Sequence, residues 1–253
     1  MTDPTRAAGP AEGGTQDWDQ FGPEYDQPPF DGTPRTYVIA SLQRSGSHML
    51  GHLLHGTDQL GSPLEYLHPR HLAKWQHLLG EPDPAATLRA VMARRTSPSG
   101  WFGVKVHWRH LAGVHEDAAI MDALDPKDWV RITRDDKVAQ AVSFVIARQT
   151  KSWISFQEVR HEPMYDFEGI AKGVRTFEKQ EAAWDAWFAE RGITPHVVVY
   201  EEMLADPART VTDVCARLGV PAPATLPDPG TTRQATATNA EWRARYLEES
   251  GGY

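Results

Sequence analysis

Cysteine is almost absent from this sequence of 253 residues, since Cys215 is its only one. A single cysteine excludes an internal disulfide and any zinc site built from cysteines. Cys215 stands among Val211, Val214 and Leu218 at helical spacing. This pattern favours a small buried core residue over a nucleophile.

Long apolar runs are also missing. The N-terminus has neither the basic start nor the apolar stretch of a signal peptide, and no later segment has the roughly 20 apolar residues that a spanning helix needs. We therefore expect a cytoplasmic protein without a membrane span.

Basic residues are outnumbered by acidic ones, 26 to 34, which gives a formal net charge of −8. Nonspecific nucleic-acid binding needs a basic face, so nucleic acid is not an expected partner. An anionic ligand stays compatible with this balance, because a few arginines and backbone N–H groups can make a local positive site.

The first 35 residues differ in composition from the rest. They are rich in Pro, Gly and Asp and show no apolar periodicity, so burial within the segment cannot offset the entropy cost of ordering it. We predict a disordered N-terminal arm over residues 1–35 and a single domain over residues 36–253.

Four apolar segments are typical of buried strands, at residues 36–41, 101–107, 129–133 and 196–200. Helical periodicity predicts helices that end at Gly192 and Gly219, and one that follows the third strand with Asp135 and Asp136 placed to cap it. Strands that alternate with helices predict an α/β fold of three layers, with a mainly parallel central sheet flanked by helices.

Polar residues follow the strands of this predicted sheet, and ligands bind at the carboxyl ends of such strands. They are the loop Gln43-Arg44-Ser45-Gly46-Ser47 after the first strand, Lys105 and His107 at the end of the second, Arg134 after the third, and Tyr200 after the fourth. Arginines, a lysine and a Gly/Ser loop at adjacent strand ends predict a pocket for a phosphate-like polyanion.

A kinase-like phosphotransferase is the weaker of the enzyme alternatives. It would need the GxxxxGK[ST] loop and a carboxylate for Mg²⁺. The loop here has neither the spacing nor the lysine, and the strands at 101–107 and 129–133 do not end in the expected Asp.

The loop "QRSGS" instead resembles the 5′-phosphosulfate loop of sulfotransferases that use 3′-phosphoadenosine 5′-phosphosulfate (PAPS), in the bacterial branch typified by trehalose 2-sulfotransferase. "TRDDKVAQAVSF" is similar to that family's R-P-D-x-x-x-Q-A-V-S-F segment, "WFGVKVHW" to its W-G-x-K-x-x-W strand and "YEEMLADP" to its Y-E-x-M/L-x-x-x-P element. The tail "RQATATNAEWRARY" resembles the family's R-Q…E-W-x-x-R-Y tail, so the match runs over about residues 36–250.

This resemblance implies a P-loop-like sulfotransferase fold and PAPS as the sulfuryl donor, with no metal. It implies that Arg134 and Ser143 bind the ribose 3′-phosphate, that Tyr200 approaches the adenosine, and that Arg233 and Gln234 close over the nucleotide. The residues expected to bind the 5′-phosphosulfate are Gln43, Arg44, Ser45, Gly46, Ser47 and His48. Residue spacing does not show that Arg134 and Ser143 meet, because nine helical residues span roughly 13 Å.

His48 departs from the family, whose loop usually continues with Thr. His48, His52 and His55 share one helical face opposite Leu50, Leu53 and other apolar residues. A metal site is one interpretation, and a polar face opposite the core stripe is the favoured one, because no carboxylate completes an HExxH-type arrangement.

Sulfuryl transfer to a hydroxyl needs a general base, and two residues compete for the role. Glu65 lies where the trehalose-type relatives carry their catalytic Glu, whereas His107 lies where cytosolic sulfotransferases carry a K-x-H base. The whole-chain resemblance favours Glu65. Lys105 is expected to neutralise phosphosulfate charge, because lysine in an anion pocket stays protonated.

The acceptor is expected to be a hydroxyl of a carbohydrate or small metabolite. Residues 150–172 are predicted to form a loop over the site. Its large side chains either contact the acceptor or pack the loop against the protein; they are Trp153, Phe156, Met164, Tyr165 and Phe167. The resemblance also implies a homodimer, although the sequence shows no self-complementary patch. A nucleotide-binding module that has lost catalysis is the third alternative, since His48 alters the loop.

Overall fold

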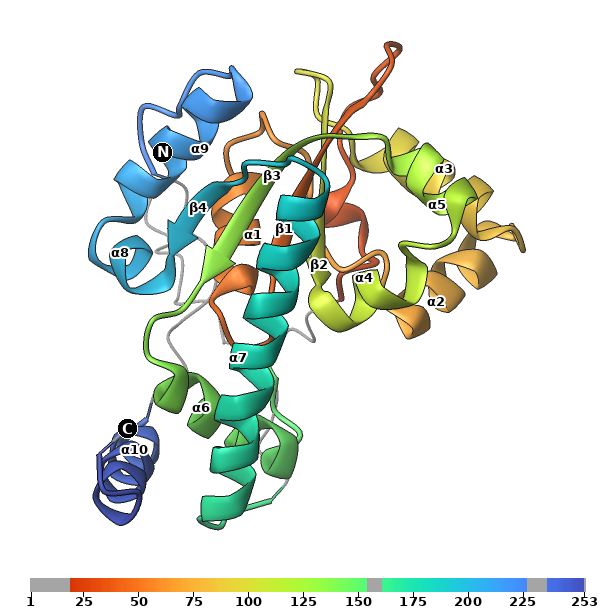
Figure 1. Cartoon of the computed structure of the whole chain (residues 1–253). Helices are drawn as coiled ribbons and strands as arrows, with labels where there is room; N and C mark the ends of the chain where they lie inside the picture. The colour runs from red at the N-terminus through yellow and green to blue at the C-terminus, as the bar shows by residue number, and fades with distance from the viewer. Residues whose placement is uncertain (1–18, 154–160, 227–235, 253) are drawn as a thin grey trace, which may run out of the picture.

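The computed structural model describes residues 19–153, 161–226 and 236–252. Four parallel strands form one sheet in the order β2-β1-β3-β4 (Figure 1). Their bounds are Arg35–Ser41 for β1, Trp101–His107 for β2, Pro126–Thr133 for β3 and His196–Val199 for β4. Helices flank the sheet, so the predicted α/β fold with a parallel sheet is confirmed.

The helices follow the predicted alternation with the strands. They are the 3₁₀ helix η1 (Pro23–Tyr25), α1 (Ser47–His55), α2 (Pro69–Leu79), α3 (Pro84–Arg95), α4 (Trp108–Val114), α5 (Ala118–Leu124), α6 (Lys137–Thr150), α7 (Phe167–Glu190), α8 (Tyr200–Ala205), α9 (Pro207–Leu218) and α10 (Ala237–Glu249). Within the three described ranges, none of these helices is long and apolar enough to cross a membrane.

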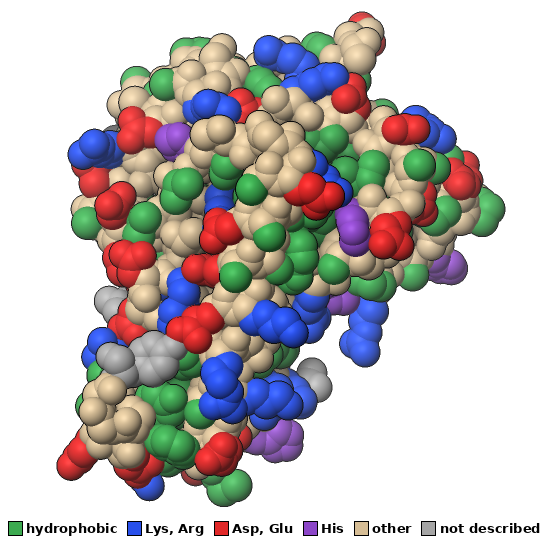
Figure 2. Space-filling view, in the orientation of Figure 1, with side chains coloured by type: hydrophobic (Ala, Val, Ile, Leu, Met, Phe, Trp, Pro, Cys, Tyr) green, Lys and Arg blue, Asp and Glu red, His purple; other side chains and the backbone are tan. Residues whose placement is uncertain are grey.

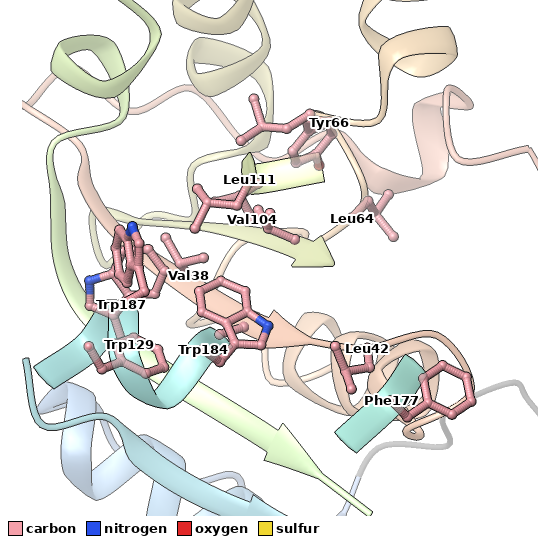
Figure 3. Packing of buried hydrophobic residues seen from close by; sticks show 14 of the residues in the cluster. Val38, Leu42, Leu64, Tyr66, Val104, Leu111, Trp129, Phe177, Trp184 and Trp187 are labelled. Carbon is pink, nitrogen blue, oxygen red and sulfur yellow. The ribbon is translucent and has the colours of Figure 1, made fainter. Parts of the chain in front are cut away.

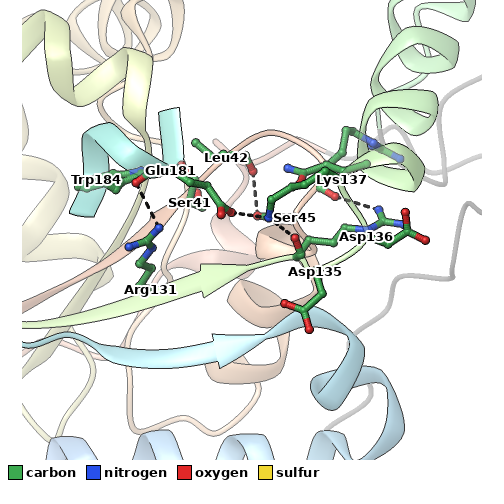
Figure 4. A network of polar contacts seen from close by, with 12 residues as sticks. Ser41, Leu42, Ser45, Arg131, Asp135, Asp136, Lys137, Glu181 and Trp184 are labelled. Carbon is green, nitrogen blue, oxygen red and sulfur yellow. Dashed lines mark hydrogen bonds and ion pairs between the residues drawn. The ribbon is translucent and has the colours of Figure 1, made fainter. Parts of the chain in front are cut away.

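Local chemistry sets the ends of the helices that border the strand ends. The Asp136 carboxylate accepts from Ala139 N–H at 2.8 Å and caps α6, as predicted. Lys137 Nζ at the start of α6 donates to Glu181 Oε1 of α7 at 2.8 Å (Figure 4). These contacts hold the start of α6 against α7 beside the carboxyl ends of β1 and β3.

The two faces of the sheet bury separate hydrophobic cores, because side chains alternate along each strand. Val38 and Ala40 of β1 face the core that contains α7. In that core the Trp129 and Trp187 rings have centroids 4.9 Å apart, with Trp184 beside them (Figure 3).

Tyr37 and Ile39 face the opposite core, which contains α1 and α9. Cys215 is fully buried there, beside Val211 and Val214. The sequence prediction that Cys215 is a core residue is confirmed.

The prediction of a disordered arm over residues 1–35 is wrong from residue 19 onward. Tyr25 is buried, its carbonyl oxygen accepts from Ser62 Oγ at 2.6 Å, and Gln27 N–H donates to Arg94 O at 2.8 Å. The segment orders because it packs on the rest of the protein, which composition within the segment could not show. Residues 1–18 lie outside the described residues.

Candidate active site

The loop between β1 and α1, residues 42–46, has an unusual backbone. Arg44 and Gly46 both have positive φ angles, 62° and 84°. A Cβ on Gly46 would lie 2.3 Å from Cδ2 of Tyr200, so only glycine fits this position. The loop is therefore shaped by the close approach of Tyr200 as well as by its own turn.

Ser45 holds this turn together. Its hydroxyl donates to Leu42 O at 2.8 Å, and its N–H donates to the same oxygen at 3.4 Å (Figure 4). Ser45 was predicted to bind phosphosulfate, but both of its donors are used inside the loop. The helix α1 starts directly afterwards with Gly46 as its N-cap, which has no side chain to satisfy the first N–H groups. Such a helix start favours an anion.

Arg44 joins two residues that are distant in sequence. Its Nε donates to Ser143 Oγ of α6 at 2.9 Å, and its carbonyl oxygen accepts from Arg134 Nη1 at 3.1 Å. The Arg134 guanidinium also lies over the Tyr200 ring, 4.7 Å from its centroid. The structure thus brings Arg134 and Ser143 to the same loop, which spacing along the helix did not predict.

Two guanidinium groups share this small region. Burial, and then the charge of Arg134, lower the pKa of Arg44 to about 10, so Arg44 stays charged at neutral pH. Glu201 Oε1 lies 3.7 Å from Arg134 Nε, and the Glu201 carboxylate also accepts from Asp135 N–H at 3.0 Å. The region is cationic and shaped to accept an anion.

Glu65 is placed at the carboxyl end of β2 by the preceding residue, Leu64. Leu64 forms a parallel bridge with Val104 of β2, and its carbonyl oxygen accepts from Lys105 N–H at 2.9 Å. This bridge places Glu65 Oε1 3.0 Å from Lys105 Nζ and 3.4 Å from His107 Nε2. We call Glu65, Lys105 and His107 the Glu65 cluster.

The carboxylate of this cluster is ionised. Burial acts to raise the pKa of Glu65, but Lys105 and His107 outweigh it and hold that pKa well below its usual range. Lys105 and His107 are buried, whereas the Glu65 side chain is 21% exposed. Glu65 is therefore the member of the cluster that a ligand can reach most easily.

The two candidate bases contact each other. His107 Nε2 faces Glu65, and its Nδ1 lies 2.9 Å from Ser41 Oγ. Both ring nitrogens of His107 are thus engaged, while both contacts to Glu65 fall on one carboxylate oxygen. This geometry leaves Glu65 Oε2 as the atom to receive a proton from a ligand.

His48 lies between the two parts of the site. Burial first, then the charges of Lys105 and His52, lower the pKa of His48 to about 2; Glu65 acts in the opposite direction but is outweighed. His48 is therefore neutral at neutral pH. Its ring lies 4.4 Å from that of His52.

The histidine face of α1 is covered by protein. His55 Nδ1 lies 3.0 Å from Ser62 Oγ, and the Tyr25 ring lies 5.8 Å from that of His52. No group of three or more His, Cys, Asp or Glu side chains that could hold a metal occurs in the described part of the chain.

The aromatic residues predicted to contact the acceptor mostly lie elsewhere. The Tyr165 hydroxyl donates to Glu249 Oε2 at 3.0 Å, and the Phe167 ring lies 5.0 Å from that of Tyr246, so both attach α10 to the protein. Trp153 lies nearer the site, because its carbonyl oxygen accepts from Arg44 Nη1. Met164 is 77% exposed. Phe156, Arg233 and Gln234 lie outside the described residues.

Sequence reasoning missed two residues that support the site. Gln140 is fully buried, and its Nε2 donates to Gln43 O at 2.8 Å, which fixes the start of the loop. Ser41 holds His107. Gln140 is the glutamine that the segment "TRDDKVAQAVSF" shares with the R-P-D-x-x-x-Q-A-V-S-F segment of the sulfotransferases, and this match was the available signal.

A parallel α/β sheet with a cationic loop beside an ionised carboxylate defines a group-transfer enzyme that handles an anionic group. Comparison with protein families gives the class its name. Residues 36–249 match the family model described as Stf0 sulphotransferase. The chain belongs to this family, and it is a sulfotransferase.

Two curated relatives cover most of the chain. It is 30% identical over 256 residues to a trehalose 2-sulfotransferase of Mycobacterium tuberculosis. This alignment covers 85% of the present chain and 96% of the relative. It is 29% identical over 263 residues to a trehalose 2-sulfotransferase of Mycolicibacterium smegmatis, with 86% and 96% covered.

Solved structures are more distant from this chain. The sulfotransferase domain of the Synechococcus PCC 7002 olefin synthase has a TM-score of 0.44 at 18% identity, covering 90% of this chain and 98% of that one. A sulfotransferase from Alicyclobacillus acidocaldarius has a TM-score of 0.45 at 18% identity, covering 88% and 97%.

Proposed function

We propose that this enzyme transfers the sulfuryl group of PAPS to a hydroxyl of a carbohydrate or small-metabolite acceptor. The observation that carries the proposal is the contact of Arg44 with both Ser143 and Arg134, because it joins the residues expected for the two phosphate groups of PAPS. Membership of the sulfotransferase family and the names of its curated relatives support it.

The β1–α1 loop is suited to the 5′-phosphosulfate end of the donor. Arg44 and the N–H groups at the start of α1 would hold this end, and the guanidinium stabilises charge on the oxygen left behind when the S–O bond breaks. Two charged arginines in contact, with burial and mutual repulsion lowering the pKa of Arg44, fit an anionic ligand. PAPS, when bound, supplies the sulfuryl group.

Arg134 and Ser143 would hold the 3′-phosphate, and Tyr200 would contact the adenosine. Arg134 is already fixed against the Tyr200 ring and the loop. Gln43, Ser45 and Gly46 act mainly by shaping the loop in this scheme. Arg233 and Gln234 keep the role that the family resemblance implies.

Glu65 is the proposed general base. Its ionised carboxylate accepts the proton of the acceptor hydroxyl on Oε2 as the new S–O bond forms. Oε1 stays in contact with His107 Nε2 at 3.4 Å, which orients the carboxylate. Lys105, 3.0 Å from the same oxygen, keeps Glu65 ionised and adds positive charge beside the transferring group.

Calorimetry without added metal tests the donor. We expect adenosine 3′,5′-bisphosphate to bind in the micromolar range or tighter, and ATP and ADP to bind much more weakly. Preference for ATP with Mg²⁺ would overturn the donor assignment. Tight binding of the bisphosphate without turnover on any hydroxyl acceptor would instead favour a nucleotide-binding module.

A further inference from the structure

Glu65 lies between α1 and α2, outside any of the helices and strands. A general base must be held close to the acceptor hydroxyl, because a misplacement of about 1 Å can cost roughly 10²-fold in rate. Lys105 and His107 fix the carboxylate end of the Glu65 side chain. The backbone that carries this side chain needs contacts of its own.

On one side this backbone is held by β2. The N–H of Lys105 donates to Leu64 O at 2.9 Å. The buried Tyr66 ring stacks on the ring of Phe102, with centroids 5.5 Å apart. The residues before and after Glu65 are thus both fixed to the sheet, and the carbonyl oxygen of Glu65 itself points to a different element.

His71, in the first turn of α2, reaches this oxygen. Its Nδ1 lies 3.0 Å from Glu65 O, whereas the N–H of His68 is 3.4 Å from the same oxygen. The half-buried His71 ring stacks on that of His68 with centroids 4.3 Å apart, and it meets the Phe21 ring edge to face at 5.7 Å. Ring contacts on two sides fix the direction of Nδ1.

Gln20, from the segment before β1, contacts the same ring nitrogen. Its side chain is buried, with 3% of the residue exposed, and its Nε2 lies 2.6 Å from His71 Nδ1. A ring nitrogen either donates or accepts a hydrogen bond, so Nδ1 either donates to Glu65 O or accepts from the Gln20 amide. The position of one proton on the His71 ring therefore decides whether the Glu65 backbone is held.

The chemistry of the two partners favours a proton on Nδ1. Burial lowers the pKa of His71, although the contact with Glu65 O and the Glu65 charge act the other way, so the ring is neutral and carries one proton at neutral pH. Glu65 O can only accept, and a bare Nδ1 would face it with a second lone pair. The Gln20 amide can instead turn and present its oxygen to the Nδ1–H.

We infer that His71 is a positioning residue for sulfuryl transfer, whose Nδ1–H holds the backbone oxygen of Glu65 and thereby keeps the carboxylate in place for the acceptor hydroxyl. The inference rests on the proposed function, since it takes Glu65 as the general base. It extends the site to α2 and, through Gln20, to a segment that precedes the residues matched by the family model.

Two substitutions separate the hydrogen bond from the packing of the ring. His71→Phe keeps an aromatic ring beside Phe21 and His68 but removes the N–H. His71→Asn removes the ring but keeps an N–H donor at the same number of bonds from Cα as Nδ1. Figure 2 shows His side chains at the surface over α2 and α4, and the exposed His77 of α2 gives the matched control, His77→Phe.

The activity measured is sulfuryl transfer from radiolabelled PAPS to trehalose or glucose. We expect His71→Phe to lower kcat roughly tenfold, and His71→Asn to keep kcat within about threefold of the wild type although it loses the ring contacts. Affinity for adenosine 3′,5′-bisphosphate should stay unchanged in all variants, and His77→Phe should match the wild type. A larger loss of kcat in His71→Asn than in His71→Phe, or no loss in His71→Phe, overturns the inference.

A double variant shows whether His71 acts through Glu65. In protein that already carries Glu65→Gln, we expect His71→Phe to lower kcat by less than about twofold, because the base that His71 positions is gone. A roughly tenfold loss in that background as well would mean that His71 acts independently of Glu65, and would overturn the inference.

NMR of the histidine nitrogens tests the hydrogen bond without an acceptor. Long-range proton–nitrogen correlation spectra, with the His71 signals assigned from their loss in His71→Asn, should show a neutral ring with its proton on Nδ1. A proton on Nε2 would mean that Nδ1 accepts from Gln20, and would overturn the inference. Failure of the wild type to bind adenosine 3′,5′-bisphosphate contradicts the proposed function instead, whatever the tautomer of His71, which separates the two failures.

Discussion

The β1–α1 loop and the Glu65 cluster lie side by side, but they are held in place differently. In the loop, side chains bind backbone oxygens: Ser45 bonds to Leu42 O, Gln140 to Gln43 O and Arg134 to Arg44 O. In the cluster, charged side chains bind each other, with Lys105 and His107 both on one oxygen of Glu65.

The difference indicates how each part can be damaged. The conformation of the loop is held by hydrogen bonds to its backbone oxygens from Ser45 and Gln140. The Arg44 side chain can therefore exchange its partners for a ligand while the loop keeps its conformation. The cluster is held by attraction between opposite charges, so removing one buried partner leaves the charge of the remaining group uncompensated and destabilises the protein. Substitutions that keep the shape but change the charge should separate the two.

Arg44→Ala should have the largest effect on activity. We expect kcat/KM for sulfuryl transfer to fall by roughly 10³-fold, because a preorganised charge beside the leaving group is removed. Arg44→Lys, which keeps the charge but not the forked donors, should recover only part of this loss. The measurement is transfer from radiolabelled PAPS, and unchanged turnover in Arg44→Ala would exclude the role given to the loop.

Glu65→Gln should lower kcat by about 10²-fold or more, the usual contribution of a general base. Affinity for adenosine 3′,5′-bisphosphate should be kept, because the loop does not depend on Glu65. His107→Ala is the comparison, and we expect a smaller loss since His107 acts through Glu65. If His107→Ala costs more in kcat than Glu65→Gln, His107 is the base.

Arg134→Ala should change nucleotide selectivity rather than chemistry. We expect affinity for adenosine 3′,5′-bisphosphate to fall by roughly 10- to 100-fold, the range for a lost charged hydrogen bond. Adenosine 5′-phosphate, which lacks the 3′-phosphate, should bind nearly as before. Calorimetry on both nucleotides decides this, and equal losses would place the 3′-phosphate site elsewhere.

His52→Gln should have the smallest effect, on stability in acid. Burial first, then Lys105 and His55, lower the pKa of His52 to about 4, whereas an unfolded histidine has a pKa of about 6.5. The unfolded chain therefore takes up the proton first, so the contribution of neutral His52 to stability is complete above pH 6.5 or so and is lost as the pH falls toward 4.

Urea unfolding at pH 7.5 and pH 5 measures this effect. The wild type should lose more stability between the two pH values than His52→Gln does, with His77→Gln, an exposed histidine on α2, as the control. An identical pH dependence in wild type and His52→Gln would show that His52 is not held neutral by the fold.

Much of the fold could be predicted from the sequence because its signals are local. The strands 101–107 and 196–199 were visible as apolar runs, and α9 from Pro207 to Leu218 has its proline, its apolar period and its terminal glycine within 13 residues. The loop after β1 was also predictable, since its arginine and glycine lie only two residues apart in the sequence. Such features need no knowledge of distant contacts.

The parts that could not be predicted depend on segments that meet only in the fold. The contact between Glu65 and His107 requires the Leu64 bridge to β2, which has no pattern of its own in the sequence. Tyr165 was expected at the acceptor because it lies in an aromatic segment, but it binds α10.

Residues 19–27 belong to the folded domain, although the match to the family model does not include them. The family match begins at residue 36, yet Asp26 forms an ion pair with Arg95 at 3.2 Å, and the Arg95 side chain is completely buried. A protein shortened to the matched region would keep a buried cation and lose its anion, together with the Tyr25 ring that lies near it. For expression and for engineered fusions, the usable unit of this enzyme therefore starts no later than residue 19, and a homologous segment is not by itself a folding unit.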